Sequence, residues 1–179
     1  MNVIDTDVLG VKLVEPKVFG DDRGFFLETF QQDRYKKMLN IDLDFVQDNH
    51  SRSSQNVLRG LHFQTCKPQG KLVRVVRGEV FDVVVDIRPE SETFGKWVGV
   101  HLSETNKNQL WVPPGLAHGF VVISDFADFE YKCTDYYDPS NEGCLIWNDP
   151  EVGVKWPVVD PLLSAKDALG KSFSELFTN

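Results

Sequence analysis

The chain has 179 residues and carries a formal net charge of −8 at pH 7, from 19 lysines and arginines against 27 aspartates and glutamates. A chain of this length can bury roughly 70% of its unfolded surface, so we expect a single domain over residues 1–179. The acidic balance disfavours polymeric nucleic acid and anionic membrane surfaces as partners, because both repel a negatively charged protein.

Cysteine usage and the opening residues indicate a cytoplasmic protein. Cys66, Cys133 and Cys144 form no CxxC pair and are odd in number, which argues against a zinc ribbon and against a secreted disulfide framework. The opening residues contain no basic segment followed by an apolar core, and no later stretch approaches the ~18 apolar residues of a membrane helix. We therefore expect reduced thiols and no membrane partner.

Short runs of β-branched and aromatic residues, separated by turn residues, recur along the chain. A helix is expected at 31–40, where Tyr35, Met38 and Leu39 share one face, and some helical character after Pro161. Closely spaced strands without crossover helices predict a mainly β fold, either a sandwich or a barrel. The predicted strands are, in chain order, residues 24–30, 44–49, 71–76, 79–88, 96–102, 109–112, 118–124, 129–137 and 144–148.

Alternation separates the faces of two of these strands. Tyr131 shares a face with Phe129 and Cys133, which is typical of core packing with the hydroxyl at the rim. Asp82 and Asp86 share a half-apolar face, and such an acidic pair is either solvated or lines a site. In the strand 79–88 the two faces are Phe81, Val83, Val85 and Ile87 against Val80, Asp82, Val84 and Asp86.

The four histidines stand alone in the local sequence. His50, His62, His101 and His118 form no HxH or HExxH motif. A surface or hydrogen-bonded core role is the ordinary expectation for each of them, and we adopt it for His101. A usual metal site needs three or four converging ligands, so the sequence does not favour one, although convergence of His62 and His118 in space stays open.

His62 lies in the strand-like run 59–64 and is the best candidate for a proton carrier. An imidazole with a pKa of about 6.5 can take up and return a proton at neutral pH when a carboxylate orients its second nitrogen. Asp82, Asp86 and Asp167 are the candidate partners, and spacing alone does not choose among them. Asp167 also ends a Ser-x-x-Asp pattern, which is typical of a helix N-terminus, and the sequence alone favours this capping role for it.

Basic residues gather around the same segments of this acidic chain. They could hold a small anionic ligand, because arginine binds phosphate oxygens through a two-pronged donor geometry. For Arg74 and Arg77 we expect ordinary surface charge instead. The group comprises Arg23, Arg52, Arg59, Lys71, Arg74 and Arg77.

Eight stretches follow one another in order and nearly from end to end of the chain. They are VFGDDRGFFLETF, FVQDNHSRSS, VLRGLHFQ, GKLVRVVRGEVFDVVVDIRPESETFGKW, VPPGLAHGF, YKCTDYYDP, IWNDP and LSAKD. Together they resemble the dTDP-4-dehydrorhamnose 3,5-epimerase family of the cupin superfamily. The resemblance implies a mainly β, cupin-type jelly-roll barrel with a few short peripheral helices. It also implies a cofactor-independent isomerase that inverts C3 and C5 of dTDP-4-dehydro-6-deoxy-D-glucose, giving dTDP-4-dehydro-L-rhamnose for dTDP-L-rhamnose biosynthesis.

The resemblance also implies roles for individual residues. His62 is the base, Asp167 holds its imidazole, Tyr131 is the acid on the opposite face of the sugar, and Lys71 places its charge near the C4 oxygen. Gln47 and Asn49 are two residues apart, so a strand would point both amides to one side, as contact with a thymine edge requires. The implied substrate-binding residues are Arg23, Glu28, Gln47, Asn49, Arg59, His118, Tyr137, Glu142 and Lys166, with Phe19, Phe26 or, preferably, Tyr137 stacked on the base.

Two further expectations concern geometry. Arg59 and His62 would point to opposite faces of a regular strand, so we expect a bulge at Gly60 to realign them. The family resemblance implies a homodimer in which Arg23 and Glu28 serve the partner's site.

The resemblance also implies a barrel without a metal. The PPGLAHGF stretch is similar to the second cupin motif, whose histidine binds metal in some relatives, but the HxH and glutamate of the first motif are absent. His118 is therefore interpreted as a substrate-binding group or as a neighbour of the base.

Three alternatives to the leading interpretation remain open. One is a related enzyme that acts on a different dTDP-4-keto sugar, or that inverts only C3 or only C5. Another is a metal-free cupin that binds an anionic sugar without chemistry. The third is a metal-dependent cupin oxygenase or isomerase.

Overall fold

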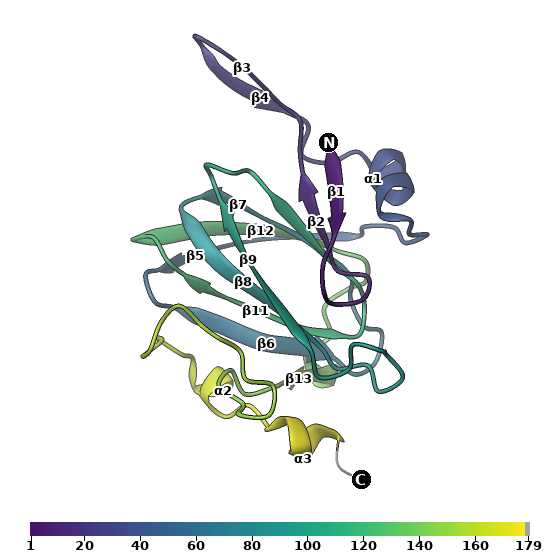
Figure 1. Cartoon of the computed structure of the whole chain (residues 1–179), viewed down its shortest axis with the longest axis vertical. Helices are drawn as coiled ribbons and strands as arrows, with labels where there is room; N and C mark the ends of the chain where they lie inside the picture. Colours follow the sequence, from purple (N-terminus) through teal and green to yellow (C-terminus); the bar gives the residue numbers. More distant parts are fainter. Residues whose placement is uncertain (178–179) are drawn as a thin grey trace.

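Two antiparallel sheets pack face to face in the computed structural model, which describes residues 1–177 (Figure 1). One sheet has the strand order β1-β2-β10-β7-β12-β5, and the other has the order β13-β6-β11-β8-β9. The first sheet contains β1 Asn2–Asp5, β2 Lys12–Glu15, β10 Gln109–Val112, β7 Lys71–Arg77, β12 Phe126–Cys133 and β5 Gln47–Ser54. The second contains β13 Glu142–Cys144, β6 Leu58–Gln64, β11 Leu116–Val122, β8 Glu79–Asp86 and β9 Trp97–Ser103.

The remaining elements lie outside the two sheets. A separate hairpin of β3 Val18–Asp21 and β4 Gly24–Leu27 extends away from the barrel (Figure 1). Helix α1 Gln32–Leu39 follows it, and the C-terminal part contributes η1 Pro139–Asn141, α2 Ala165–Ala168 and α3 Phe173–Phe177. The expected mainly β, jelly-roll barrel with short peripheral helices is confirmed. Within residues 1–177, no helix has the length and apolar character needed to span a membrane.

Helix α1 forms as its sequence predicts. The side chain of Gln31 accepts a hydrogen bond from the backbone N–H of Arg34, and Asn40 ends the helix in the left-handed conformation at φ 57°. Tyr35 and Leu39 are buried against the outer face of the first sheet, in a cluster with Trp111.

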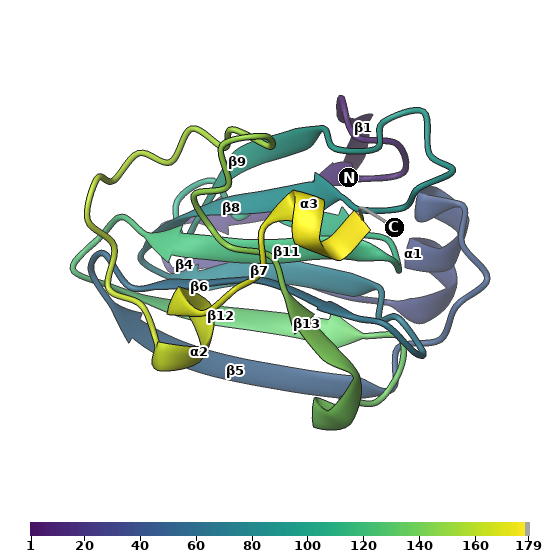
Figure 2. The ribbon, with the colours of Figure 1, turned by 90° about the horizontal axis from the view of Figure 1, so that it is seen from below.

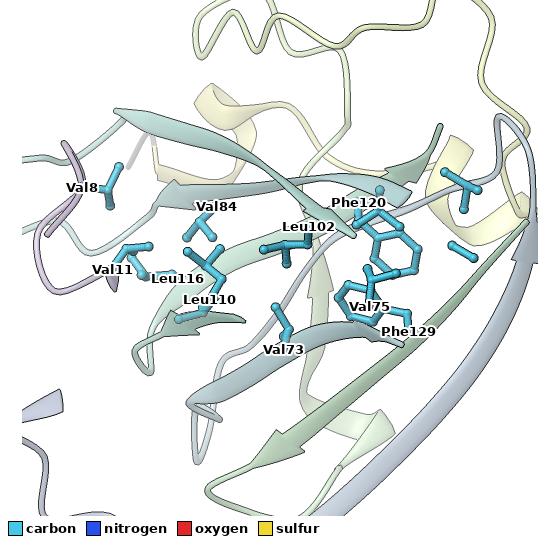
Figure 3. Close-up of a cluster of buried hydrophobic side chains, with 14 residues drawn as sticks. Val8, Val11, Val73, Val75, Val84, Leu102, Leu110, Leu116, Phe120 and Phe129 are labelled. Carbon is cyan, nitrogen blue, oxygen red and sulfur yellow. The ribbon is translucent and has the colours of Figure 1, made fainter. Parts of the chain in front are cut away.

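A layer of aliphatic and aromatic side chains fills the space between the two sheets (Figure 3). Strand β8 contributes to two such layers because both of its faces are apolar. Val80 and Val84 lie in the interior cluster, whereas Val83 and Val85 lie in an outer cluster that includes Phe173 of α3. The predicted division of this strand into two faces is confirmed, and Figure 2 shows α3 over this side of the sheet.

The expected bulge is present in β6. His118 of β11 pairs with His62 and Phe120 pairs with Arg59, so two residues of β6 oppose the single residue Gly119. Gly60 has φ +130°, and a Cβ added there would lie 2.6 Å from the Cα of Gly119. A glycine at this position therefore permits both the backbone angle and the close approach of the two strands.

The C-terminal segment returns across β6 and brings α2 to the barrel. Parallel bridges join Val57 to Leu162 and Leu145 to Lys171. The buried carboxylate of Asp149 accepts hydrogen bonds from three backbone N–H groups, including that of Phe173 at 2.8 Å. These contacts hold the C-terminal segment, which carries Lys166 and Asp167, against the barrel.

Several predicted boundaries were wrong. The strand predicted at 44–49 lies at β5 Gln47–Ser54, whose sequence QDNHSRSS has no apolar residue to mark it. The strand predicted at 144–148 lies at β13 Glu142–Cys144, and the next residue, Leu145, bridges to Lys171 of the C-terminal segment. The strands β1, β2 and β3 were missed, and the strand predicted at 129–137 begins earlier and ends at Cys133.

Candidate active site

Alternate residues of the first sheet place polar groups at one end of the barrel interior. Tyr131 of β12 pairs with Asn49 of β5 and with Val73 of β7, and Cys133 pairs with Gln47 and Lys71. Residues directly paired across strands point to the same face. The first sheet thus presents two amides, a phenol and an ammonium beside the apolar interior.

The second sheet presents two histidines opposite these groups. His62 of β6 and His118 of β11 are direct cross-strand partners. The imidazole of His62 contacts the carboxylate of Asp167 in α2, with 2.5 Å between Nε2 and Oδ1. Of the three candidate partners, Asp167 is the one that contacts His62. Its backbone N–H also donates to Ser164 Oγ at 3.1 Å, so the helix-capping pattern and the contact with the histidine coexist.

The electrostatics of this pair favour a carboxylate. Burial raises the pKa of Asp167, but hydrogen bonds with His62 and Ser164 outweigh this effect and hold the pKa below its usual value. An ionised Asp167 can only accept, so His62 donates from Nε2. The neutral imidazole then has its lone pair on Nδ1, the atom that lies 3.7 Å from Glu142 Oε1.

His118 forms a second pair with a carboxylate. Its Nε2 lies 2.9 and 3.0 Å from the two oxygens of Asp82, which is fully buried. Burial raises the pKa of Asp82, while His118 and Lys71 act in the opposite direction. The sequence offers Asp82 as a partner for His62, but the structure pairs it with His118. This pairing depends on the register of β8 against β11, which the sequence does not reveal.

Asp86 does not reach the site, although it shares a strand with Asp82. Its carboxylate accepts hydrogen bonds from Arg88 at 2.7 Å and from Ser91 and Thr93 at 2.6 Å. Burial raises the pKa of Asp86, but these hydrogen bonds outweigh it and lower the pKa to about 2. Asp86 holds the loop after β8 and is neither solvated nor part of the site.

Lys71 and Tyr131 lie side by side on neighbouring strands of the first sheet. Burial lowers the pKa of Lys71, and the nearby Cys133, Glu142 and Asp82 partly offset the effect. Burial likewise raises the pKa of Tyr131, so its phenol stays protonated at neutral pH. The site therefore places the Lys71 amine and a neutral proton donor close together.

Two cavities meet at these residues. One has a volume of about 460 Å³ and is lined on one side by the C-terminal segment, including Lys166 and Asp167. The other has a volume of about 330 Å³ and is lined by Gln47, Asn49, Tyr137 and Glu142 among others. Both volumes lie in the usual range for small-molecule sites. The residues that line both cavities are His62, Lys71 and Tyr131.

Hydrogen bonds organise the second cavity. Tyr137 donates from its hydroxyl to Glu142 at 2.6 Å, and Glu142 also pairs with Lys166. Burial raises the pKa of Glu142, but these two partners hold it below its usual value. Gln47 accepts from the backbone N–H of Tyr137 at 3.0 Å and donates to Asn49 at 3.2 Å. The expected same-side placement of Gln47 and Asn49 is confirmed.

Arg59 reaches the first cavity because of the bulge at Gly60. It lines the cavity together with His62, and its Nε donates to Ser53 Oγ at 2.9 Å. The other basic residues divide between the site and the surface. Arg52 pairs with Asp128 and Arg74 with Glu130 outside the two cavities.

Four of the residues expected in the site do not join it within this chain. Arg23 pairs with Asp21 on the exposed hairpin, and Glu28 pairs with Arg34. Phe19 and Phe26 are exposed to 54% and 71% on the same hairpin. Of the three aromatic residues expected to stack on the base, Tyr137 is the one that lines either of these two cavities.

The surface role expected for His101 is confirmed. His101 is exposed and its Nδ1 lies 2.7 Å from Glu79. The sequence predicts no role for Cys144, but it lies beside His62, because the two residues are cross-strand partners in β13 and β6. Burial raises the pKa of its thiol to about 11. With His62 and Asp167 it forms a group that could hold a metal ion.

Comparison with known proteins agrees with this geometry. Residues 5–175 match the family described as dTDP-4-dehydrorhamnose 3,5-epimerase. The chain is 58% identical over 170 residues to the dTDP-4-dehydrorhamnose 3,5-epimerase of Salmonella typhimurium strain LT2. The aligned region covers 94% of this chain and 93% of that protein.

Solved structures give the same result. The dTDP-6-deoxy-D-glucose-3,5-epimerase of Legionella pneumophila Philadelphia 1, in complex with dTDP-4-keto-L-rhamnose, has a TM-score of 0.94 and 55% identity over 97% of this chain and 93% of that one. A 3'-monoepimerase from Streptomyces bikiniensis, in complex with dTDP-quinovose, has a TM-score of 0.89 and 31% identity over 96% of this chain and 88% of that one. The chain belongs to the dTDP-4-dehydrorhamnose 3,5-epimerase family.

Proposed function

We propose that the protein is a cofactor-independent isomerase that converts dTDP-4-dehydro-6-deoxy-D-glucose into dTDP-4-dehydro-L-rhamnose, by inverting C3 and C5 in dTDP-L-rhamnose biosynthesis. The observation that carries the proposal is the pairing of His62 with Asp167 at the junction of two cavities, opposite Lys71 and Tyr131. The family match and the complex of the Legionella relative support the substrate class.

The chemistry requires a base and an acid on opposite faces of the sugar. C3 and C5 both flank the C4 ketone, so removal of either proton gives an enolate whose charge lies on the C4 oxygen. His62 comes from the second sheet and Tyr131 from the first, and both line the space between them. A sugar in that space would have the imidazole on one side and the phenol on the other, which is the arrangement that inversion needs.

The supporting residues fit the charge changes of this reaction. Asp167 accepts from His62 Nε2, leaves Nδ1 free to take the proton, and stabilises the imidazolium that forms. Lys71 supplies a preorganised positive charge for the enolate oxygen. Loss of such a charge typically costs about 2.7–4 kcal/mol of barrier.

The remaining substrate-binding roles follow the division into two cavities. Gln47, Asn49 and Tyr137 in the second cavity suit the thymine base. Arg59, Lys166 and His118 in the first cavity suit the diphosphate and the sugar. Glu142 lies between Tyr137 and Lys166 and sets the positions of both.

We also propose that the active species is a cytoplasmic homodimer of single-domain chains. The β3–β4 hairpin would supply Arg23, Glu28 and the aromatic side chains of Phe19 and Phe26 to the partner's site. The proposal is supported by the exposure of both phenylalanines and by the distance of the hairpin from the barrel of its own chain (Figure 1).

A coupled assay tests the reaction. The protein is incubated with dTDP-4-dehydro-6-deoxy-D-glucose, a 4-keto reductase and NADPH, and the reduced sugar is identified by NMR. We expect dTDP-L-rhamnose. A product inverted at C3 alone would instead support a monoepimerase like the Streptomyces bikiniensis relative, and return of unreacted substrate despite dTDP binding would support a binding protein.

A further inference from the structure

Cys144 lies next to the proposed base and takes no part in the proposed reaction. Strand β13 pairs with β6 so that Cys144 and His62 are direct antiparallel partners, and such partners have Cβ atoms about 4.5–5.5 Å apart on the same face. Asp167 approaches His62 from α2. One ligand atom from each of the three residues lies within 4.8 Å of the other two.

The three side chains form a mixed set of sulfur, nitrogen and oxygen donors. Zn²⁺ binds cysteine sulfur at about 2.3 Å and histidine nitrogen at about 2.0–2.1 Å, so neighbouring ligands on one tetrahedral ion lie roughly 3.3–3.6 Å apart. Atoms that already lie within 4.8 Å need only small side-chain movements to reach that spacing. Three protein ligands leave the fourth position of the ion for water, as in open zinc sites.

The surroundings add negative charge to the donor set. Glu142 Oε1 lies 3.7 Å from His62 Nδ1, and the Glu142 side chain is only 9% exposed. The carboxylate of Asp167 is almost completely buried. Lys166 pairs with Glu142 and neutralises one of the two carboxylates, which leaves the other to balance a cation.

We propose that His62, Cys144 and Asp167 bind a thiophilic divalent cation such as Zn²⁺, and that the bound cation inhibits the enzyme reversibly. Inhibition rests on the proposed function. An ion shared by His62 Nε2 and Asp167 would hold the proton of the neutral imidazole on Nδ1, so the base could not take a proton from the sugar. A thiolate ligand selects Zn²⁺ or Cd²⁺ over the hard cations Mg²⁺ and Ca²⁺. The ion is an inhibitor in this scheme, and His118 of the cupin-like motif is not one of its ligands.

Binding is tested separately from activity. The chelator-treated, dialysed protein is titrated with Cd²⁺ while the ultraviolet charge-transfer absorption of a cadmium–thiolate bond is recorded. We expect the absorption to saturate at one equivalent in the unmodified protein and in the control Cys66→Ser, whose cysteine is exposed and outside the group. The absorption should be lost in Cys144→Ser. An unchanged signal in Cys144→Ser would overturn the site.

Inhibition is then measured with Zn²⁺ and reversed with EDTA. Cys144→Ser should keep its activity without metal, and its half-inhibitory Zn²⁺ concentration should rise by roughly 10–100-fold or more, the range that loss of even an outer partner of a metal site produces. Mg²⁺ and Ca²⁺ should not inhibit. Equal sensitivity of Cys144→Ser and the unmodified protein would contradict the proposal.

Two other outcomes separate this proposal from the proposed function. Cadmium–thiolate absorption without any loss of activity would contradict inhibition through His62 and would weaken its assignment as base. Loss of activity on chelation alone would overturn the inhibitory role and would favour a metal-dependent enzyme. Absence of reaction in the coupled assay, with the cadmium signal intact, would refute the proposed function and leave the cation site standing.

Discussion

His62 and Asp167 are 105 residues apart in the chain and 2.5 Å apart in the structure. Two local features bring Asp167 to the histidine. Ser164 caps the first turn of α2 by accepting from the backbone of Asp167, so the carboxylate itself remains available to His62. The parallel bridge between Val57 and Leu162 holds the preceding segment against the start of β6.

Asp167→Asn should lower kcat by about a hundredfold or more, because general acid–base catalysis by a positioned group contributes roughly 10²–10⁴-fold. The amide keeps the size of the side chain but loses the charge that, in the proposed reaction, stabilises the imidazolium. The affinity for dTDP, measured by calorimetry, should not change. Unchanged kcat in this variant would show that the contact with His62 is structural only.

Lys71→Met should lower kcat by about 10²–10³-fold, the usual cost of losing one preorganised donor. Because burial lowers the pKa of Lys71, the ammonium is present below that pKa and is lost as pH rises through it. In the unmodified enzyme kcat should therefore fall on the alkaline side before the range of an ordinary lysine.

Two further measurements separate a role in the reaction from a role in folding at Lys71. Lys71→Arg should shift the alkaline fall in kcat upward, because arginine keeps its charge to higher pH. The free energy of unfolding of Lys71→Met at pH 7 should stay the same or increase, since a buried charge is removed. A large loss of stability together with an unchanged pH profile would contradict the assignment.

At the scale of elements, the bulge in β6 decides which side chains share the site. Without it Arg59 and His62 would lie on opposite faces, because their separation in the sequence is odd. Gly119 on β11 contributes as much as Gly60, since a Cβ on Gly119 would lie 2.6 Å from the carbonyl oxygen of Arg59. The two facing glycines allow the strands to approach where the bulge changes the register.

Gly60→Ala should destabilise the protein by more than Gly24→Ala. Both glycines have similar φ angles, +130° and +127°, which carry a cost of order 1–3 kcal/mol for other residues. A Cβ at Gly60 also meets the Cα of Gly119, whereas a Cβ at Gly24 has nothing within 4 Å. Denaturant unfolding measures the difference, and equal losses of stability in the two variants would show that β11 can move away.

The same elements show what the sequence could predict. Alternation in 79–88 correctly separated the two faces of β8, and the spacing of Gln47 and Asn49 correctly placed both amides on one side, because a strand has a fixed period of two. The odd separation of Arg59 and His62 correctly pointed to the bulge.

What the sequence could not predict depends on register between distant strands. The pairing of His118 with Asp82 follows from how β8 aligns with β11, and the position of Cys144 beside His62 follows from β13. No local pattern encodes either alignment. The boundaries of β5 were missed for a different reason, because its interior residues include polar groups that line the site and therefore lack an apolar signal.

At the scale of the whole molecule, aliphatic and aromatic side chains fill the barrel interior and border the polar cavity, and the β3–β4 hairpin projects away from the barrel (Figure 1). An exposed hairpin with several aromatic side chains is a large apolar surface for a monomer to leave in water. A symmetric dimer that exchanges this hairpin would cover it and complete each site.

Mixing two inactive variants tests that arrangement. His62→Ala chains lack the base, and Arg23→Ala chains lack the residue proposed for the partner's site. In a mixed dimer, the site of the Arg23→Ala chain has its own His62 and receives Arg23 from the other chain. Random exchange should restore about a quarter of the activity of the unmodified dimer, because half of the dimers are mixed and each has one complete site.

No gain of activity on mixing would contradict the exchange of Arg23, provided that size-exclusion chromatography of differently tagged chains shows mixed dimers. A protein that elutes as a monomer at assay concentration would contradict the dimer itself.

The most direct test of the central claim is to incubate the protein with dTDP-4-dehydro-6-deoxy-D-glucose in deuterated water and to locate the label by NMR. In the proposed reaction His62 removes a proton and Tyr131 delivers another that has exchanged with solvent. The unmodified protein should therefore give deuterium at both C3 and C5. Tyr131→Phe should reduce incorporation with inversion at one carbon more than at the other. Label at one carbon alone in the unmodified protein, or no label at all, would contradict the double epimerisation.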